Sequence, residues 1–191
     1  MTLWYIDRAT AIVALVLFSV VVLLGVWVRL RVRLPGLPRF GTVALHRSVS
    51  LLAAAFLGTH IATVVLDSHV SVGVLDVVVP FTAGYQPLWV GLGTVAADLL
   101  LAVLVTSLLR PRIGLRTWRA VHWFGYACWP VAMAHSLGVG TDTGSGVALW
   151  ITVASALLVA AAVVLHLTHP SARRQRAADL LAAPHASRIG E

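Results

Sequence analysis

Residues 9–28 read ATAIVALVLFSVVVLLGVWV, an uncharged run of twenty residues between Arg8 and Arg29. A helix rises about 1.5 Å per residue, so this run can cross the roughly 30 Å hydrocarbon core of a bilayer. No basic stretch precedes it and no small-residue cleavage site follows it, so we interpret it as a retained anchor rather than a signal peptide. This run therefore predicts an integral membrane protein.

The composition of the whole chain agrees with this interpretation. Of 191 residues, 59% are hydrophobic and 11% are charged, and the mean hydropathy is +0.91. An average soluble domain is about 45–50% apolar and about 25% charged. The chain has too little charge to cover a water-soluble body, which argues strongly against a soluble enzyme. The net charge is +7 and every basic residue is Arg, but no polar basic domain is present to bind nucleic acid.

Four further apolar runs follow the first, so we predict an all-α membrane bundle of about five transmembrane helices. The expected spans cover about residues 9–29, 44–66, 87–109, 118–140 and 147–168. We expect residues 1–170 to form one domain and residues 171–191 to form a short, flexible cytoplasmic tail. The apolar stretch 70–84 contains Asp76 and Pro80, so we expect it to lie along the outer interface, with a re-entrant segment as the alternative.

The arginines predict how the bundle is oriented. With five spans, the first loop, the third loop and the tail share one face, and these three regions hold thirteen of the fourteen arginines. Basic residues are enriched in cytoplasmic loops, so this face should be cytoplasmic. We therefore expect a multi-pass protein of the cell membrane with its N-terminus outside and its C-terminus inside.

Four histidines fall inside the expected spans, where an ionisable residue marks a candidate functional site. His46 and His60 lie on the second span, and His122 and His135 on the fourth. Both spans run from the cytoplasmic to the outer face, so His46 and His122 form an inner pair, and His60 and His135 an outer pair. The spacings of fourteen and thirteen residues correspond to about 21 Å and about 19.5 Å along a helix. The two pairs therefore lie at nearly matching depths.

Paired imidazoles on facing helices are typical axial ligands of haem iron. Two haems at these depths would carry an electron most of the way across the bilayer. Fourteen residues return to within about 40° of the starting face of a helix, but thirteen end about 140° away. Pro130, between His122 and His135, removes a helix hydrogen bond, so a kink there can rotate one half of the helix. The alternative is that the histidines are hydrogen-bonded packing residues.

These residues together resemble the ferric reductase-like transmembrane domain, a superfamily of ferric reductases, the membrane half of NADPH oxidases and bacterial haem-binding subunits. The resemblance covers roughly Ala44 to Thr143, and five segments carry it: Leu45-His46-Arg47-Ser48, Thr59-His60, Thr106-Ser107-Leu108-Leu109-Arg110, Trp118-Arg119-Ala120-Val121-His122 and Ala134-His135. It implies two b-type haems, the inner one on His46 and His122 and the outer one on His60 and His135. The family shares the off-phase spacing of the second pair.

Two departures from the family pattern change what the resemblance implies. Full-length ferric reductases and oxidases continue into FAD and NADPH domains, whereas this sequence ends about twenty residues after its last expected span. We therefore expect no flavin or NAD(P) site in this chain, and a separate cytoplasmic flavoprotein as the electron donor. The oxidase branch has another histidine one turn beyond the outer ligand, where this sequence has Val64. Superoxide production is accordingly not expected.

The function predicted from the sequence is that of a di-haem b-type membrane cytochrome, the electron-transfer membrane subunit of a reductase. The acceptor at or beyond the outer face would be ferric iron, a quinone or a redox protein. A haem-free, histidine-lined proton or metal transport protein is the alternative, and a structural membrane subunit is a third hypothesis. His69, His166, His169 and His185 receive no role.

Three further features of the sequence allow more than one interpretation. Arg47 and Arg119 are placed to bind haem propionates, or they only set the topology at helix ends. Asp98, in the middle of the third span, is protonated or bonded to the second nitrogen of a ligand histidine, or it makes a structural contact between helices. Residues 91–96, GLGTVA, match a dinucleotide fingerprint, but they open a membrane helix. Small residues there are expected to permit close helix contact.

Overall fold

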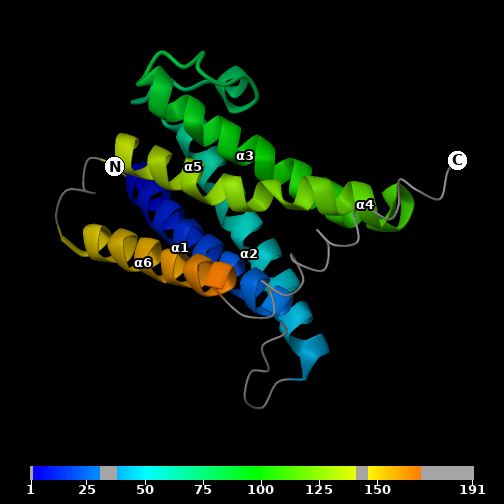
Figure 1. The fold of residues 1–191 in the computed structure, drawn as a ribbon. Helices are drawn as coiled ribbons and strands as arrows, with labels where there is room; N and C mark the ends of the chain where they lie inside the picture. Colours follow the sequence, from blue (N-terminus) through cyan, green and yellow to red (C-terminus); the bar gives the residue numbers. More distant parts are fainter. Residues whose placement is uncertain (1, 31–37, 141–145, 169–191) are drawn as a thin grey trace, which may run out of the picture.

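The computed structural model describes residues 2–30, 38–140 and 146–168, and these residues form a helical membrane bundle (Figure 1). Four helices in this part of the chain are long and apolar enough to cross a membrane. They are α1 (Thr2–Leu30), α2 (Arg39–Leu66), α3 (Pro87–Leu108) and α6 (Gly146–Thr168). Long uncharged runs form these helices because a bilayer leaves the backbone no water to bond, so every N–H and C=O must pair within the helix.

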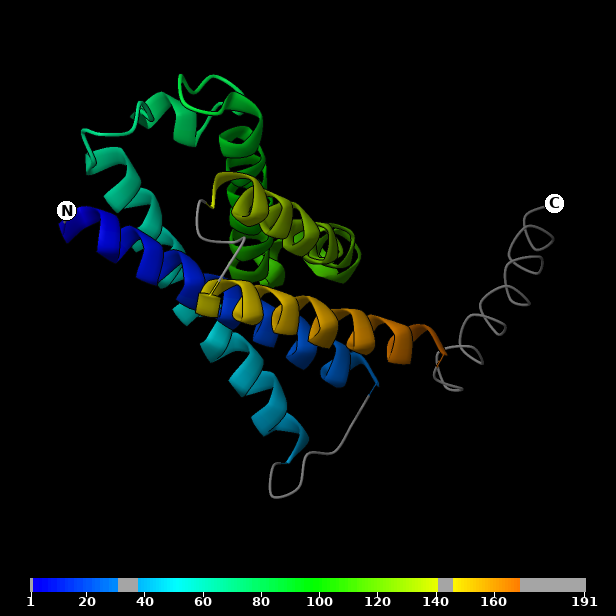
Figure 2. The same ribbon diagram turned by 90° about the vertical axis from the view of Figure 1, so that its left-hand side faces the viewer.

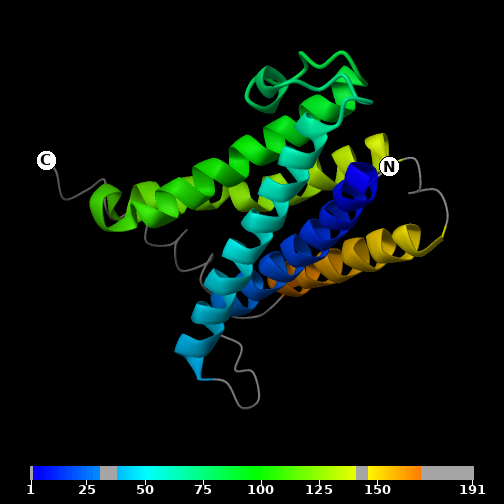
Figure 3. The same cartoon turned by 180° about the vertical axis from the view of Figure 1, so that it is seen from behind.

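The helices form two groups that meet at α1. In the first group α1 packs against α2 on one side and against α6 on another, and α1 and α6 lie side by side in Figure 2. In the second group α3 packs against α5 (Phe124–Val139). Trp129 on α5 donates its indole N–H to the Ser19 hydroxyl of α1 at 3.0 Å, which ties the groups together. Figure 3 shows α2 running steeply across the α3–α5 pair.

The fourth expected span, residues 118–140, is divided between two helices. α4 covers Arg110–His122, and α5 alone has 16 residues, or about 24 Å of helix, which is short for a bilayer. Trp123 between them keeps a helical conformation, with φ −63° and ψ −28°, so the second part of α4 and α5 run on in the same direction. Together the two helices supply the length that the sequence predicted for one span.

The start of α4 lies inside the region expected to be the third loop. The first turn of α4 follows directly on α3, and the chain changes direction at Gly114, with φ 77° and ψ 163°. A side chain would be strained in this conformation, so glycine is needed at this position. The loop is therefore a helical turn, and Pro111 near its start suits the first turn of a helix because it needs no amide donor.

Residues 67–86 connect α2 to α3 and fold against the start of α3 through a short 3₁₀ turn, η1 (Val74–Val77). The Asp76 carboxylate accepts hydrogen bonds from the Gly73 amide at 2.8 Å and the Thr82 hydroxyl at 2.6 Å. These two bonds lower the pKa of Asp76, because they stabilise its charged form. Thr94 of α3 donates to the Asp76 carbonyl at 2.7 Å. The segment is thus a hydrogen-bonded cap on α3 rather than a helix that enters the bundle.

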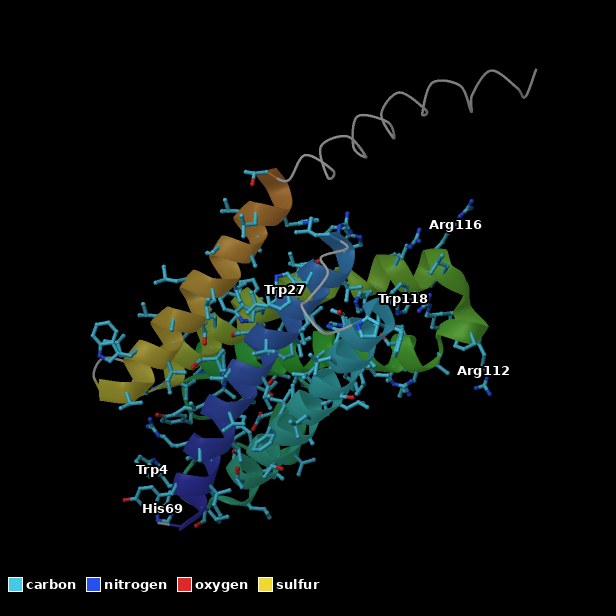
Figure 4. All side chains as sticks on the ribbon, turned by 90° about the horizontal axis from the view of Figure 1, so that it is seen from below. Trp4, Trp27, His69, Arg112, Arg116 and Trp118 are labelled. Carbon is cyan, nitrogen blue, oxygen red and sulfur yellow. The ribbon has the colours of Figure 1, made fainter. Side chains whose placement is uncertain are left out.

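Basic side chains lie at the end of the bundle where α3 meets α4. Figure 4 shows Arg112 and Arg116 at this end, and Trp4 and His69 at the opposite end. This arrangement is the one expected from the arginine pattern, and the cytoplasmic assignment of the arginine end stays a prediction. The tail, residues 171–191, lies outside the described residues. The buried core is narrow, whereas large apolar side chains such as Trp150, which is 72% exposed, cover the outside as a lipid-facing surface requires.

Candidate functional site

The two predicted histidine pairs come together between α2 on one side and the α4–α5 segment on the other. The ring centres of His46 and His122 are 6.3 Å apart, and those of His60 and His135 are 6.4 Å apart. The planes of the rings are inclined by 73° in the inner pair and by 69° in the outer pair. Each pair therefore leaves a gap of nearly the same width between its two imidazoles.

The junction of α4 and α5 accommodates part of the off-phase spacing of His122 and His135. The Tyr126 amide donates to the Trp123 carbonyl at 3.1 Å, a tight 3₁₀-type turn, and Pro130 further on has no amide to donate. A residue in a 3₁₀ turn advances about 120° rather than about 100° around the axis, which adds rotation in the direction that the spacing lacks. One such turn supplies about 60° of the roughly 140° that the spacing lacks, and the ring separations show that both histidines reach the side of the segment that faces α2.

His135 is held on α3 through its Nδ1 nitrogen. Its Nδ1 lies 2.8 Å from the Trp89 carbonyl oxygen. A carbonyl only accepts, so this nitrogen carries the proton and Nε2 carries the lone pair that can bind a metal. Gly93 makes room for the ring, since a Cβ atom there would lie 2.6 Å from His135. The small residues of the stretch 91–96 thus permit close contact, as expected.

His60, the outer partner, has a carboxylate neighbour that the sequence reasoning missed. Oδ1 of Asp7 on α1 lies 2.7 Å from Nδ1 of His60, at ion-pair distance but off the line of a hydrogen bond. A signal for this contact was present in the helix ends. α1 ends at Leu30 and α2 begins at Arg39, so in two antiparallel helices the residue level with position 60 (39 + 21) is position 9 (30 − 21), two residues from Asp7.

The inner pair is supported by an aromatic side chain instead of a carboxylate. The Trp118 ring stacks on His122 with centres 4.7 Å apart and planes inclined by 25°. The Trp118 indole N–H donates to the Ser107 hydroxyl at 3.2 Å, and the Arg110 guanidinium lies 4.5 Å from the centre of the Trp118 ring. This contact with the ligand candidate His122 was also missed, although Trp118 stands one helical turn before it in the sequence.

His46 packs on α1 beside Gly25. A Cβ atom at Gly25 would lie 3.5 Å from the His46 ring, which is an ordinary van der Waals contact. Nδ1 of His46 is buried with no hydrogen-bond partner among the described residues. Nδ1 of His122 is likewise buried with no hydrogen-bond partner among the described residues. Buried imidazole nitrogens normally find partners, so these two side chains are incompletely satisfied as they stand.

The donor set fits a group that is bound from two opposite sides. An imidazole nitrogen binds a metal at about 2.0–2.1 Å and lies about 1.1–1.2 Å from its ring centre, so two imidazoles flanking one metal have ring centres about 6.2–6.6 Å apart. Both observed separations, 6.3 and 6.4 Å, fall in this interval. Two neutral nitrogen donors per site are what a haem iron needs at its axial positions.

The arginines predicted to bind haem propionates lie next to the inner pair. Arg47 follows His46 on α2, Arg119 lies one turn before His122 on α4, and both are exposed. Neither makes a hydrogen bond, ion pair or stacking contact with another described residue. Both cations are therefore available at the inner end of the gap, and their binding role stays a prediction.

Asp98 does not contact a histidine. Its side chain is exposed on α3, and within residues 2–30, 38–140 and 146–168 it has no hydrogen-bond or ion-pair partner. The carboxylate next to a ligand candidate is Asp7. Cys128 is buried against α3, with its thiol donating to the Ala96 carbonyl at 3.1 Å, as expected for a small packing residue.

The other four histidines lie away from the pairs or outside the described residues. His69 is an exposed loop residue whose Nδ1 and backbone amide bind the Asp67 carboxylate at 2.9 and 3.0 Å, and these bonds lower the pKa of Asp67. His166 is buried on α6. His169 and His185 lie outside the described residues.

Comparisons with known proteins add one finding to this geometry. A family model described as "Ferric reductase like transmembrane component" matches residues 10–133, a range that includes His46, His60 and His122 and ends just before His135. No curated protein and no solved structure matches significantly. The family model covers well over half of the chain. This protein therefore belongs to the ferric reductase-like transmembrane family, whose general role is electron transfer in a membrane.

Proposed function

We propose that the chain is a di-haem membrane cytochrome b that carries electrons between the two faces of the membrane. In this proposal His46 and His122 hold the inner haem, and His60 and His135 hold the outer one. The observation that carries the proposal is that two separate histidine pairs have ring centres 6.3 and 6.4 Å apart, the separation of two axial ligands on one iron. A packing role would not require both gaps to have this width.

The side chains around each gap orient its imidazoles. The Trp89 carbonyl fixes the proton of His135 on Nδ1, so that Nε2 is the free donor. The Trp118 ring holds the plane of His122 by stacking, and the Ser107 hydroxyl fixes Trp118 in turn. When bound, each haem supplies one-electron chemistry in which no bond to a substrate forms or breaks. No side chain of this chain therefore needs to act as a general acid or base.

The two ends of the bundle suit different partners. The four arginines of α4 present a cationic surface close to the inner pair, which favours a donor with an acidic surface, and we propose a separate flavoprotein. These residues are Arg110, Arg112, Arg116 and Arg119. At the other end, an outer acceptor such as ferric iron, a quinone or a redox protein would receive the electron. We propose the cell membrane as the location, with the arginine end cytoplasmic.

The arginines next to the inner pair have a proposed second role. Haem propionates are anions, and Arg47 and Arg119 bring exposed guanidinium groups to within one helical turn of His46 and His122. Arginine binds carboxylates through two parallel N–H donors, so each can hold one propionate at the inner face.

The absorption spectrum of the purified, full-length chain tests the proposal. Protein from haem-replete cells should show a Soret band and sharp α-bands on reduction, with about two haems per chain in a pyridine haemochrome assay. A colourless, well-folded preparation would contradict it and would favour the haem-free transport protein or the structural subunit.

A further inference from the structure

Asp7 is an acidic residue at the outer pair with no part in the predicted ligand set. Its carboxylate lies on α1, 25% exposed, and meets His60 of α2, which is 17% exposed, at 2.7 Å. A partly buried carboxylate on a bilayer-spanning helix is energetically unfavourable unless it is paired. The pairing of Asp7 with His60 therefore indicates that the carboxylate has a role at the outer pair.

The nitrogen that Asp7 contacts is Nδ1, which leaves Nε2 of His60 as the atom for a ligand. A carboxylate or carbonyl on the second nitrogen of a metal-binding histidine fixes the tautomer and ring orientation and makes the imidazole more basic. His135 has the neutral version of this arrangement, with the Trp89 carbonyl at 2.8 Å. The outer pair thus has one imidazole held by a carbonyl and one held by a charged group.

The chain contains a second pair of the same chemistry that serves as a comparison. Asp67 and His69 meet at 2.9 Å in the loop after α2, where the histidine side chain is 82% exposed. This pair lies at the same end of the bundle but away from the gap. A change at Asp67 therefore removes a similar carboxylate contact without touching the outer pair.

Resting on the function proposed above, we infer that Asp7 is a positioning residue of the outer haem. Its carboxylate, at ion-pair distance from Nδ1 of His60, favours the tautomer with the proton on Nδ1, leaves Nε2 as the donor for the ligand, and adds a negative charge to the outer site. Negative charge close to an iron stabilises the oxidised, more positive state, so Asp7 lowers the reduction potential of the outer haem relative to the same site with a neutral residue.

The test is a spectroelectrochemical titration of the full-length, haem-loaded protein. The wave of the outer haem is identified first as the one that is lost in His60→Leu. Asp7→Asn, which keeps an oxygen acceptor but removes the charge, should raise the midpoint potential of this wave and leave the other unchanged. Asp7→Glu should bring the midpoint back toward the original value, and Asp67→Asn should move neither wave.

A second readout covers the case in which the variant binds haem poorly. In Asp7→Ala the affinity of the outer site for haem should fall by about tenfold or more, the usual effect of removing a partner of a metal-binding histidine. The haem content per chain should fall accordingly. Unchanged midpoints in Asp7→Asn, together with full outer occupancy in Asp7→Ala, would overturn the inference while leaving the di-haem proposal intact. Wild-type protein without haem would instead overturn the proposed function itself.

Discussion

The outer and inner histidine pairs have nearly the same ring separation, 6.4 and 6.3 Å, but their surroundings differ. At the outer pair, polar groups reach the second ring nitrogens, with Asp7 at His60 and the Trp89 carbonyl at His135. At the inner pair the support is a stacked ring, Trp118 on His122, with a guanidinium on the same tryptophan. The common gap points to a common ligand type, and the different supports point to different electronic tuning.

Removal of one imidazole should produce the largest difference between the two pairs. His60→Leu should abolish the outer haem and keep the inner one, so haem content falls from about two to about one per chain. The reason is that a single remaining imidazole cannot hold both axial positions. Haemochrome assays and reduced spectra measure this. His69→Leu is the control, because His69 lies in the outer loop, and equal haem loss in that variant would show that the ligands are misassigned.

Crowding His135 should be the next largest effect. Gly93→Ala places a Cβ about 2.6 Å from the His135 ring, closer than real contacts allow, so the ring must move. Overpacking of this kind costs about 1–3 kcal/mol, and we expect reduced occupancy of the outer site alone. Gly58→Ala, two residues before His60, meets nothing within 4 Å and should bind haem normally. Loss from the inner site in Gly93→Ala would contradict the assignment.

The stacked support of the inner pair is expected to contribute less. Trp118→Leu removes a ring contact worth about 0.5–1.5 kcal/mol, so the inner haem should bind a few-fold to about tenfold more weakly. Trp118→Phe keeps a ring and should lose less. Thermal release of haem, followed at the two α-bands, distinguishes the sites. Trp150→Leu, on the exposed surface of α6, should change neither band.

The smallest effect concerns the loop that caps α3 at the outer end. The pKa of Asp76 is held below its usual 3.8 by the bonds from Thr82 and Gly73. The stabilisation is therefore complete above pH 3.8 and is lost as the pH falls through the lower, folded pKa. Hydrogen exchange of residues 67–86, corrected for intrinsic rates, should show the loop opening in this acidic range. Asp76→Asn should open it already at neutral pH, whereas an unchanged exchange rate would disprove this role of the carboxylate.

The spacing of the histidines was enough to predict which of them pair. Position along a helix determines depth in the membrane, so His46 had to lie level with His122, and His60 with His135. The contacts of Asp7 and Trp118 depend on how each helix is rotated about its axis, and a nearly uniform apolar run such as residues 9–28 carries little information on rotation. The lateral neighbours of the site were for this reason missed.

Some helix ends were predictable from the sequence and others were not. α2 ends at Leu66 and α3 begins at Pro87, the residues that the charges and the proline predicted. The division of the fourth span at Trp123 and the early start of α4 were not predicted. Both depend on local backbone geometry, including the φ of 77° at Gly114, which apolar periodicity does not record.

The electron paramagnetic resonance spectrum of the oxidised, full-length protein tests the central claim most directly. If each histidine pair supplies both axial ligands of one haem iron, the spectrum contains two low-spin ferric signals and no stoichiometric high-spin signal. The ring planes, inclined by 73° and 69°, further predict that both signals are strongly anisotropic, since near-parallel imidazoles give a rhombic pattern instead. A high-spin signal from half or more of the haem would contradict the account, because it would mean an open coordination position at the iron.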